Sequence, residues 1–181
     1  MTRYYYTMLD LSIGQVGLVW LAEEPHWLMG ITLPEDHTDT FSLLRNRFPD
    51  PQPGSHKRID KICLQLERYD QGKDITFPLS ELNLHRYNEF YRRVWTETYH
   101  IPRGKVGAYG QVARRISMPM AARAVGMALG KNPFPLIIPC HRVVKSNGDL
   151  GGFSGGGIIM KRRLLEKEGI VFDSRGRVKV G

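Results

Sequence analysis

The feature that most constrains the fold is a change in hydrophobic pattern along the 181-residue chain. Short apolar runs bounded by turn residues fill the beginning, whereas apolar residues at helical spacing dominate later. The early runs lie at residues 4–9, 16–23 and 27–32, with Ser12-Ile13-Gly14 and Glu24-Pro25 between them. Aromatic and β-branched runs bounded in this way are typical of strands. The first thirty residues therefore predict a small antiparallel sheet.

Helices are predicted to follow this sheet. A proline-containing connection holds a short helix at 41–48, and a longer helix runs from a cap at Ser55 to Gly72. Its apolar stripe consists of Ile59, Ile62, Cys63, Leu66 and Tyr69. A cysteine on such a stripe is typically a small buried hydrophobe, so Cys63 is assigned to the core. Residues 74–84 are predicted to be an extended linker.

Short helices are predicted after residue 85, at 87–99, 109–116, 119–129 and 159–168. Ser117-Met118-Pro119 separates the second from the third, with Ser117 as a cap, which is the pattern of a helix-turn-helix. We predict an α+β fold with a boundary at 84/85. Residues 1–84 form a small antiparallel-sheet domain with helices, and residues 85–181 a mostly helical domain with a helix-turn-helix and an active-site loop.

The charge is distributed unequally between the two halves of the chain. Residues 1–90 carry 9 Lys and Arg against 13 Asp and Glu, whereas residues 91–181 carry 17 against 5. A basic half favours a partner rich in phosphates, although a merely solvated basic surface is the alternative. No run approaches the roughly 20 apolar residues of a membrane span, and no signal pattern opens the chain. We expect a cytoplasmic protein without a membrane partner.

The predicted helix at 119–129 is unusually bare. Its small residues are Ala121, Ala122, Ala124, Gly126 and Ala128, and Arg123 is its one long projecting side chain. A bare helix can approach another surface closely, either the core of its own protein or the floor of a DNA groove. The lone Arg123 favours the second.

Cys140 is the candidate nucleophile. A thiol attacks as thiolate and needs a base, and the adjacent His141 can serve through a water if its ring points away on an extended strand. A carboxylate that orients the ring completes the arrangement, and Glu166 and Glu168 on the final helix are available. The two cysteines, Cys63 and Cys140, are far apart, which argues against a disulfide, and no ligand spacing near Cys140 indicates a metal.

A short apolar strand at 136–138 and a hairpin turn at Asn147-Gly148 are predicted around Cys140. The glycine-rich run 151–157 lets the backbone press against a ligand, or is a flexible surface loop. It lacks the Walker and dinucleotide patterns. The basic tail 170–181 either adds nonspecific DNA affinity or, as we favour, is simply solvated.

Together these residues resemble the O6-alkylguanine-DNA alkyltransferases, which are single-turnover DNA repair proteins. The resemblance runs from Phe90 to Gly169, whereas the first half is similar only in outline. It rests on the runs Ala121-Ala122-Arg123-Ala124-Val125-Gly126, Asn132-Pro133, Pro135, Ile138-Pro139-Cys140-His141-Arg142-Val143-Val144, Ser154-Gly155-Gly156, Lys161, Leu164-Leu165 and Glu168-Gly169.

The resemblance implies that the partner is double-stranded DNA containing O6-alkylguanine, bound through the minor groove by a monomer. Arg123 would fill the gap left by the flipped-out guanosine, and Tyr109 would press on the 3′ phosphate and donate to guanine N3. Further DNA contacts are implied for Ala121, Ala122, Gly126 and Ser146. The substrate pocket would be formed by Pro135, Val143, Phe153 and Ser154.

The same resemblance implies the chemistry. Cys140 would take the alkyl group irreversibly, with His141 as its base, Glu168 orienting His141, and Asn132 holding the loop and a water. No cofactor is implied, and no structural zinc is expected because no cysteine precedes Cys63.

The sequence departs from the family pattern at two positions. Phe153 stands where many relatives have tyrosine, and Gly157 adds a residue before Lys161 and Glu168. Two other functions remain open at this point. One is a DNA-binding module without chemistry, and the other is a cysteine hydrolase that uses Cys140 and His141.

Overall fold

A computed structural model describes residues 2–180, and the chain divides into two compact units, Met1–Arg86 and Tyr87–Gly181. The division falls two residues after the boundary predicted from the sequence. Within the described residues, no helix is long and apolar enough to cross a membrane.

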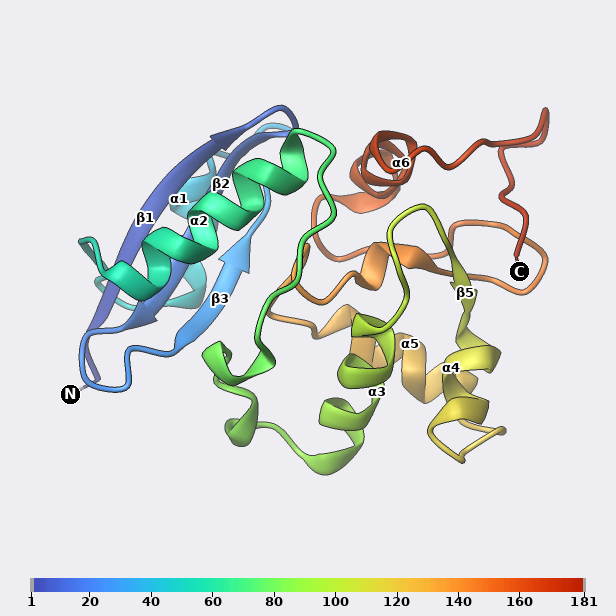
Figure 1. Ribbon diagram of the computed structural model, residues 1–181, viewed down its shortest axis with the longest axis horizontal. Helices are drawn as coiled ribbons and strands as arrows, with labels where there is room; N and C mark the ends of the chain where they lie inside the picture. Colours follow the sequence, from blue (N-terminus) through green and yellow to red (C-terminus); the bar gives the residue numbers. More distant parts are fainter. Residues whose placement is uncertain (1, 181) are drawn as a thin grey trace. The chain divides into compact units, whose positions relative to one another are not determined.

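The first unit contains a four-stranded sheet in the order β3-β2-β1-β4 (Figure 1). The strands β1 (Tyr4–Leu11), β2 (Gly14–Leu21) and β3 (Leu28–Thr32) pair antiparallel, which confirms the predicted sheet. A short edge strand, β4 (Gln52–Pro53), pairs parallel to β1 and was not predicted. Its two residues are too few for a periodic signal, and proline is tolerated in strands mainly at an edge.

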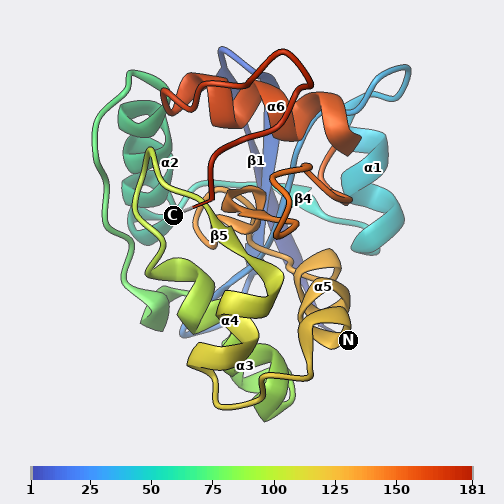
Figure 2. The same cartoon turned by 90° about the vertical axis from the view of Figure 1, so that its right-hand side faces the viewer.

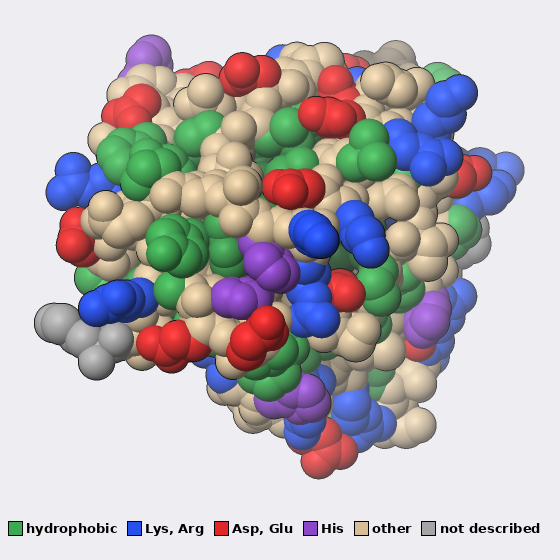
Figure 3. Space-filling model, turned by 60° about the vertical axis from the view of Figure 1, so that its left-hand side comes forward, with side chains coloured by type: hydrophobic (Ala, Val, Ile, Leu, Met, Phe, Trp, Pro, Cys, Tyr) green, Lys and Arg blue, Asp and Glu red, His purple; other side chains and the backbone are tan. Residues whose placement is uncertain are grey.

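Two helices cover opposite faces of this sheet, α1 (Thr40–Arg47) and α2 (Lys57–Asp70) (Figure 2). The middle of β2 is accordingly buried. The predicted cap at Ser55 is wrong, because the His56 side chain accepts from the Arg58 N–H and α2 begins at Lys57. Charged side chains of both signs and histidines are intermingled on the face shown in Figure 3.

The assignment of Cys63 to the core needs a correction, because its side chain is only half-buried. The buried stripe of α2 has three- and four-residue spacing, at Ile59, Ile62, Leu66 and Tyr69, and Cys63 lies at its edge. Burial, with the nearby carboxylates of Asp60 and Glu67, raises the pKa of the Cys63 thiol to about 11. This thiol stays protonated at neutral pH and is a poor nucleophile.

The second unit is mostly helical, as predicted. Its helices are α3 (Glu89–Tyr99), α4 (Tyr109–Arg115), α5 (Ala122–Gly130) and α6 (Gly157–Lys167). The first three pack against one another around Trp95, which is fully buried and whose indole N–H donates to the carbonyl of Ala128 at 2.9 Å. The small residues of α5 thus allow α3 to pack closely against it and allow the Trp95 indole to reach the carbonyl of Ala128.

The turn between α4 and α5 differs from the prediction. Ser117 does not cap α5, because it lies in the turn with a φ of 60°, and α5 begins only at Ala122. Met118 precedes Pro119 and is therefore biased away from helical conformation. The turn closes instead through the Ala121 N–H, which donates to the carbonyl of Met118 at 2.9 Å.

The strand predicted at 136–138 is absent, and the segment forms a turn. Leu136 has a φ of 72°, and the Ile138 N–H donates back to the carbonyl of Phe134. Pro135 and Pro139 flank the segment and cannot donate to a ladder, so a paired strand is unfavourable here. As a result, Cys140–Arg142 form a short 3-10 helix, and Cys140 and His141 are not on an extended backbone.

The hairpin predicted around Asn147 is also wrong, because the strand before this turn does not pair with a strand after it. The strand β6 (Val143–Val144) pairs parallel with β5 (Gly107–Ala108), which lies far away in sequence. Asn147 remains in a turn, which the Gly148 N–H closes onto the carbonyl of Lys145 at 2.9 Å. The partner of a two-residue strand is set by the tertiary fold, not by the local turn signal.

The tail is docked onto the second unit, contrary to the expectation that it is simply solvated. Val178 is 5% exposed and belongs to a core cluster with Val144, Leu150 and Leu165. The Val178 N–H donates to the carbonyl of Gly148, and Arg177 pairs with Asp149 at 2.9 Å. The apolar positions of the tail therefore anchor it beside the turn that follows β6.

Candidate active site

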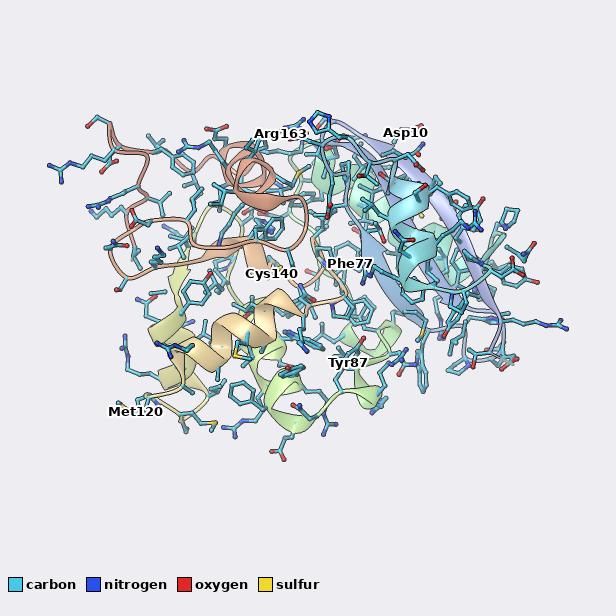
Figure 4. All side chains as sticks on the ribbon, turned by 180° about the vertical axis from the view of Figure 1, so that it is seen from behind. Asp10, Phe77, Tyr87, Met120, Cys140 and Arg163 are labelled. Carbon is cyan, nitrogen blue, oxygen red and sulfur yellow. The ribbon has the colours of Figure 1, made fainter. Side chains whose placement is uncertain are left out.

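Cys140 lies beside α5 (Figure 4) and lines a cavity of about 400 Å³. Only 6% of the residue is exposed. One wall of the cavity is α5, and the other is the glycine-rich loop that precedes α6. The lining residues that bear on function are Tyr109, Arg123, Gly126, Met127, Phe153 and Ser154. A reactant must enter this cavity to reach the sulfur atom.

Asn132 makes direct contact with the thiol. Its Nδ2 donates to Sγ of Cys140 at 3.1 Å and to the carbonyl of Ile138 at 2.9 Å, and its Oδ1 accepts from the Phe134 N–H at 3.0 Å. This one buried side chain thus fixes the turn that carries Cys140 and supplies a donor to the sulfur. The family resemblance implied that Asn132 holds the loop and a water. The structure shows its bonds to the loop and, in addition, a direct bond to the sulfur.

His141 and Glu168 meet in the interior, with both side chains fully buried. His141 Nε2 lies 2.8 Å from Glu168 Oε1, although 27 residues separate them in sequence. Since an ionised carboxylate only accepts, this contact places the imidazole proton on Nε2. His141 Nδ1 then keeps its lone pair, and this buried atom has no protein hydrogen-bond partner.

Arg142 completes the cluster and was not recognised in the sequence. Its Nε and Nη2 donate to the two carboxylate oxygens of Glu168 at 2.8 and 2.9 Å, and Nη1 donates to the carbonyl of Ile101 at 2.6 Å. Such a bidentate pair holds the carboxylate in one orientation. The sequence offered no signal for this contact, because it depends on how α6 packs against the 3-10 helix.

The electrostatics of the cluster follow from burial. Burial by itself would raise the pKa of Glu168, but His141 and Arg142 hold that pKa well below its usual range. Burial lowers the pKa of His141, against the opposing effect of Glu168, so the imidazole is neutral at neutral pH. Burial also raises the pKa of the Cys140 thiol, although the Asn132 hydrogen bond and the nearby Lys161 oppose this shift. The resting site therefore holds a thiol next to a neutral base.

Lys161 is a second residue whose contribution the sequence did not reveal. It is fully buried, and its Nζ donates to the carbonyls of Val143 and Leu150 at 2.7 and 2.6 Å. Burial lowers the pKa of Lys161 to about 8, with the nearby Cys140 opposing the shift. One sequence signal could have indicated that Lys161 is buried. It lies on the apolar stripe of α6 together with Met160, Leu164 and Leu165.

Glycines precede and open α6. Gly156 is its N-cap and Gly157 its first residue, with φ values of 92° and 75° that suit glycine. From this start, Lys161 reaches the carbonyl of Val143 and Glu168 reaches His141, as the family resemblance implied for Glu168.

Tyr109 stands at the start of α4 and lines the cavity. A Cβ atom on Gly151 would lie 2.8 Å from the Tyr109 hydroxyl, and one on Gly126 would lie 3.6 Å from its ring. Both glycines thus let their backbones approach this ring. Burial and the nearby Cys140 raise the pKa of Tyr109, so its hydroxyl keeps its proton.

The other predicted site residues are distributed unevenly around the cavity. Arg123 and Ser146 are exposed, and Ala121 and Ala122 are half-buried at the start of α5. Pro135 and Val143 are buried and are not among the residues that line the cavity. The carbonyl of Val143 already accepts from Lys161. Among residues 2–180, no group of three or more His, Cys, Asp or Glu side chains could hold a metal ion.

Comparisons with known proteins show the family to which this chain belongs. Residues 89–170 match the family model described as "6-O-methylguanine DNA methyltransferase, DNA binding domain". A methylated-DNA-protein-cysteine methyltransferase of Mycobacterium tuberculosis is 45% identical over 165 residues, covering 91% of this chain and 92% of the relative. One from Haemophilus influenzae is 38% identical over 181 residues, covering 97% and 92%.

The fold is shared with solved structures as well. The crystal structure of Mycobacterium tuberculosis OGT in complex with DNA superposes with a TM-score of 0.72 at 36% identity. The O6-methylguanine methyltransferase of the same organism gives a TM-score of 0.73 at 36% identity. Each comparison covers 91% of this chain and 92% of the other. The likeness therefore extends over both units, including the first, where the sequence showed it only in outline.

Proposed function

Because the chain belongs to the methylated-DNA-protein-cysteine methyltransferase family, we propose that it repairs DNA by moving an alkyl group from O6 of guanine to Sγ of its own Cys140. The observation that carries this proposal is the arrangement around Cys140. A buried thiol accepts a hydrogen bond from Asn132, and the neighbouring His141 is held by Glu168 with one lone pair free.

Activation of the thiol begins with proton transfer to His141. The lone pair of Nδ1 accepts the proton through a water, and the negative charge of Glu168 stabilises the imidazolium that forms. The Asn132 amide then donates to the thiolate. A hydrogen bond to a charged group contributes about 1.5–3 kcal/mol, so this contact stabilises the thiolate selectively over the thiol.

The transfer itself is an in-line displacement. A lone pair on Sγ forms a bond to the alkyl carbon while the carbon–O6 bond breaks, and its electron pair remains on the guanine as an anion. Tyr109, whose hydroxyl stays protonated, donates toward guanine N3 and so stabilises the leaving anion. The backbone N–H of Ser154 donates a hydrogen bond to O6 of the guanine. Phe153 forms an apolar wall of the pocket. No cofactor takes part in this sequence of steps.

The position of Cys140 supports base flipping. Its sulfur is 6% exposed within a cavity, out of reach of O6 in a stacked guanine, so in this proposal the nucleotide is flipped out of the duplex. The bare face of α5, with Ala121, Ala122 and Gly126, allows a close approach to the minor groove. Arg123 then occupies the space of the extruded guanosine. Ser146, which is exposed in the turn after β6, contacts the DNA backbone.

The reaction consumes the protein. A thioether on Cys140 is stable, because a carbon–sulfur bond of this kind is not hydrolysed by water. Each monomer therefore repairs one lesion. Such a substrate places the action of the protein on DNA inside the cell.

The test uses a duplex with one O6-methylguanine and mass spectrometry of the digested protein. We expect one added methyl on the Cys140 peptide, no transfer by Cys140→Ala despite retained DNA affinity, and normal transfer by Cys63→Ala as the matched cysteine control. An unmodified Cys140 on tightly bound DNA would instead identify a lesion-binding module without chemistry. Repeated turnover would indicate a hydrolase.

A further inference from the structure

Two exposed methionines lie on either side of Arg123 in sequence, Met120 in the turn before α5 and Met127 on the helix itself. Met120 is 96% exposed and Met127 is 62% exposed, whereas Met29 and Met160 are buried in the core. Scattered exposed apolar residues are common on protein surfaces. Met118 in the same turn is less exposed, at 41%. Most of the residues between Met120 and Met127 are small, namely Ala121, Ala122, Ala124 and Gly126, so they cover little of either methionine side chain.

Met127 lies one helical turn after Arg123 on α5, so the two side chains share a face. Both line the cavity that holds Cys140. At 62% exposure, Met127 must lie at the rim of this cavity, because a group deep inside would be covered as Cys140 is. A residue at the rim contacts the DNA strand that carries the flipped nucleotide, and not the base inside the cavity.

Met120 lies in the turn before α5, at the outer end of that helix (Figure 4). It contributes nothing to the packing of α5, whose buried residues are Val125, Ala128 and Leu129. The structural need of this turn is met by the backbone bond between Ala121 and Met118. Almost any residue could therefore stand at position 120 without loss of the fold.

We propose that Met120 and Met127 are apolar DNA contacts on either side of Arg123, packing against the deoxyribose and base edges of the groove that receives α5. This inference rests on the proposed function, in which duplex DNA docks on α5. Methionine is unbranched and polarisable, so it adapts to an irregular surface, and proteins that bind the minor groove insert such apolar side chains beside the bases. The exposed Arg114 on α4 and Lys131 at the end of α5 supply positive charge for phosphates, whereas Arg115 is paired with Glu97 at 3.1 Å.

The proposal predicts which step the methionines affect. Met120→Ala and Met127→Ala should each weaken binding to an unmodified duplex by about tenfold, which corresponds to partial burial of one such side chain. The slope of affinity against salt should not change, because no phosphate contact is lost. Met127→Leu, which keeps most of the apolar surface, should recover most of the affinity. Leu64→Ala, at a residue 55% exposed on α2, is the matched control and should bind as the wild type does.

Binding by fluorescence anisotropy and single-turnover transfer to Cys140 provide the readouts. Transfer is measured from an O6-methylguanine duplex and from the free base O6-methylguanine, and the ratio of the two rates should fall about tenfold in each alanine variant. Wild-type affinity in both alanine variants would overturn the proposal. So would an equal fall of both rates in Met127→Ala, since Met127 would then only shape the cavity. The anisotropy measurement tests the methionine contacts independently of alkyl transfer. The proposed function fails only if the wild-type protein leaves Cys140 unmodified.

Discussion

Replacing Glu168 with glutamine removes one negative charge from the most buried part of the site. Glu168 accepts two bonds from Arg142 and one contact from His141, all between 2.8 and 2.9 Å. The Arg142 side chain is only 11% exposed, so the variant leaves a buried guanidinium without its counter-ion. Breaking one partner of a buried pair costs about 3–5 kcal/mol. For a chain of this length that is a fall in Tm of about 6–20 °C.

The same substitution acts on the chemistry. Without the carboxylate, the imidazolium that forms when His141 takes the thiol proton loses its stabilising charge. Because positioned acid–base catalysis contributes about 10²–10⁴ in rate, we expect a single-turnover transfer rate lower by about that factor. The two effects come from one side chain and should appear together.

Thermal melting and single-turnover transfer from an O6-methylguanine duplex measure these effects. Glu166→Gln is the matched control, because Glu166 is an exposed neighbour on α6 whose pair with Arg162 at 3.6 Å contributes only about 0–1 kcal/mol. A Glu168→Gln protein that melts and transfers like the control would refute this account of the buried cluster.

Three further predictions concern the same unit. Asn132→Asp loses the donor to Sγ of Cys140 and should slow transfer by about 10- to 100-fold. The pH profile of thiol alkylation should show a higher apparent pKa for Cys140. An unchanged profile would contradict the direct bond. Burial lowers the pKa of His141 in the folded state, so below the unfolded value of about 6.5 only the unfolded chain binds the proton. The free energy of unfolding should therefore fall as the pH drops from 6.5, and less steeply in His141→Gln, as denaturant titrations at several pH values would show. Truncation after Gly169 removes the buried Val178 and should cost about 1.5–3 kcal/mol in the same titrations, whereas Val171→Ala, at an exposed tail position, should cost little.

The sequence predicted those elements whose signal is local and periodic. The three antiparallel strands of the first unit and the helices of the second have apolar residues at the spacing of their secondary structure, and they form close to where they were expected. The meeting of His141 with Glu168 could be anticipated from the family resemblance.

The segment around Cys140 could not be predicted in the same way. Leu136 adopts a positive φ that bulky residues rarely take, and the short apolar run looked like a strand. Arg142 and Lys161 gain their roles only when α6 packs against the 3-10 helix and β6, which no spacing in the sequence records. Cys63 was placed by a helical pattern that does not distinguish the centre of a stripe from its edge.

The most direct measurement of the central claim is the stoichiometry of repair with methylated duplex in large excess. We predict that the amount of O6-methylguanine lost equals the amount of protein, that the loss then stops, and that every methyl group is recovered on Cys140. Loss of more lesions than protein molecules, or methyl groups recovered on another residue, would contradict the assignment of Cys140 as a nucleophile that is used once.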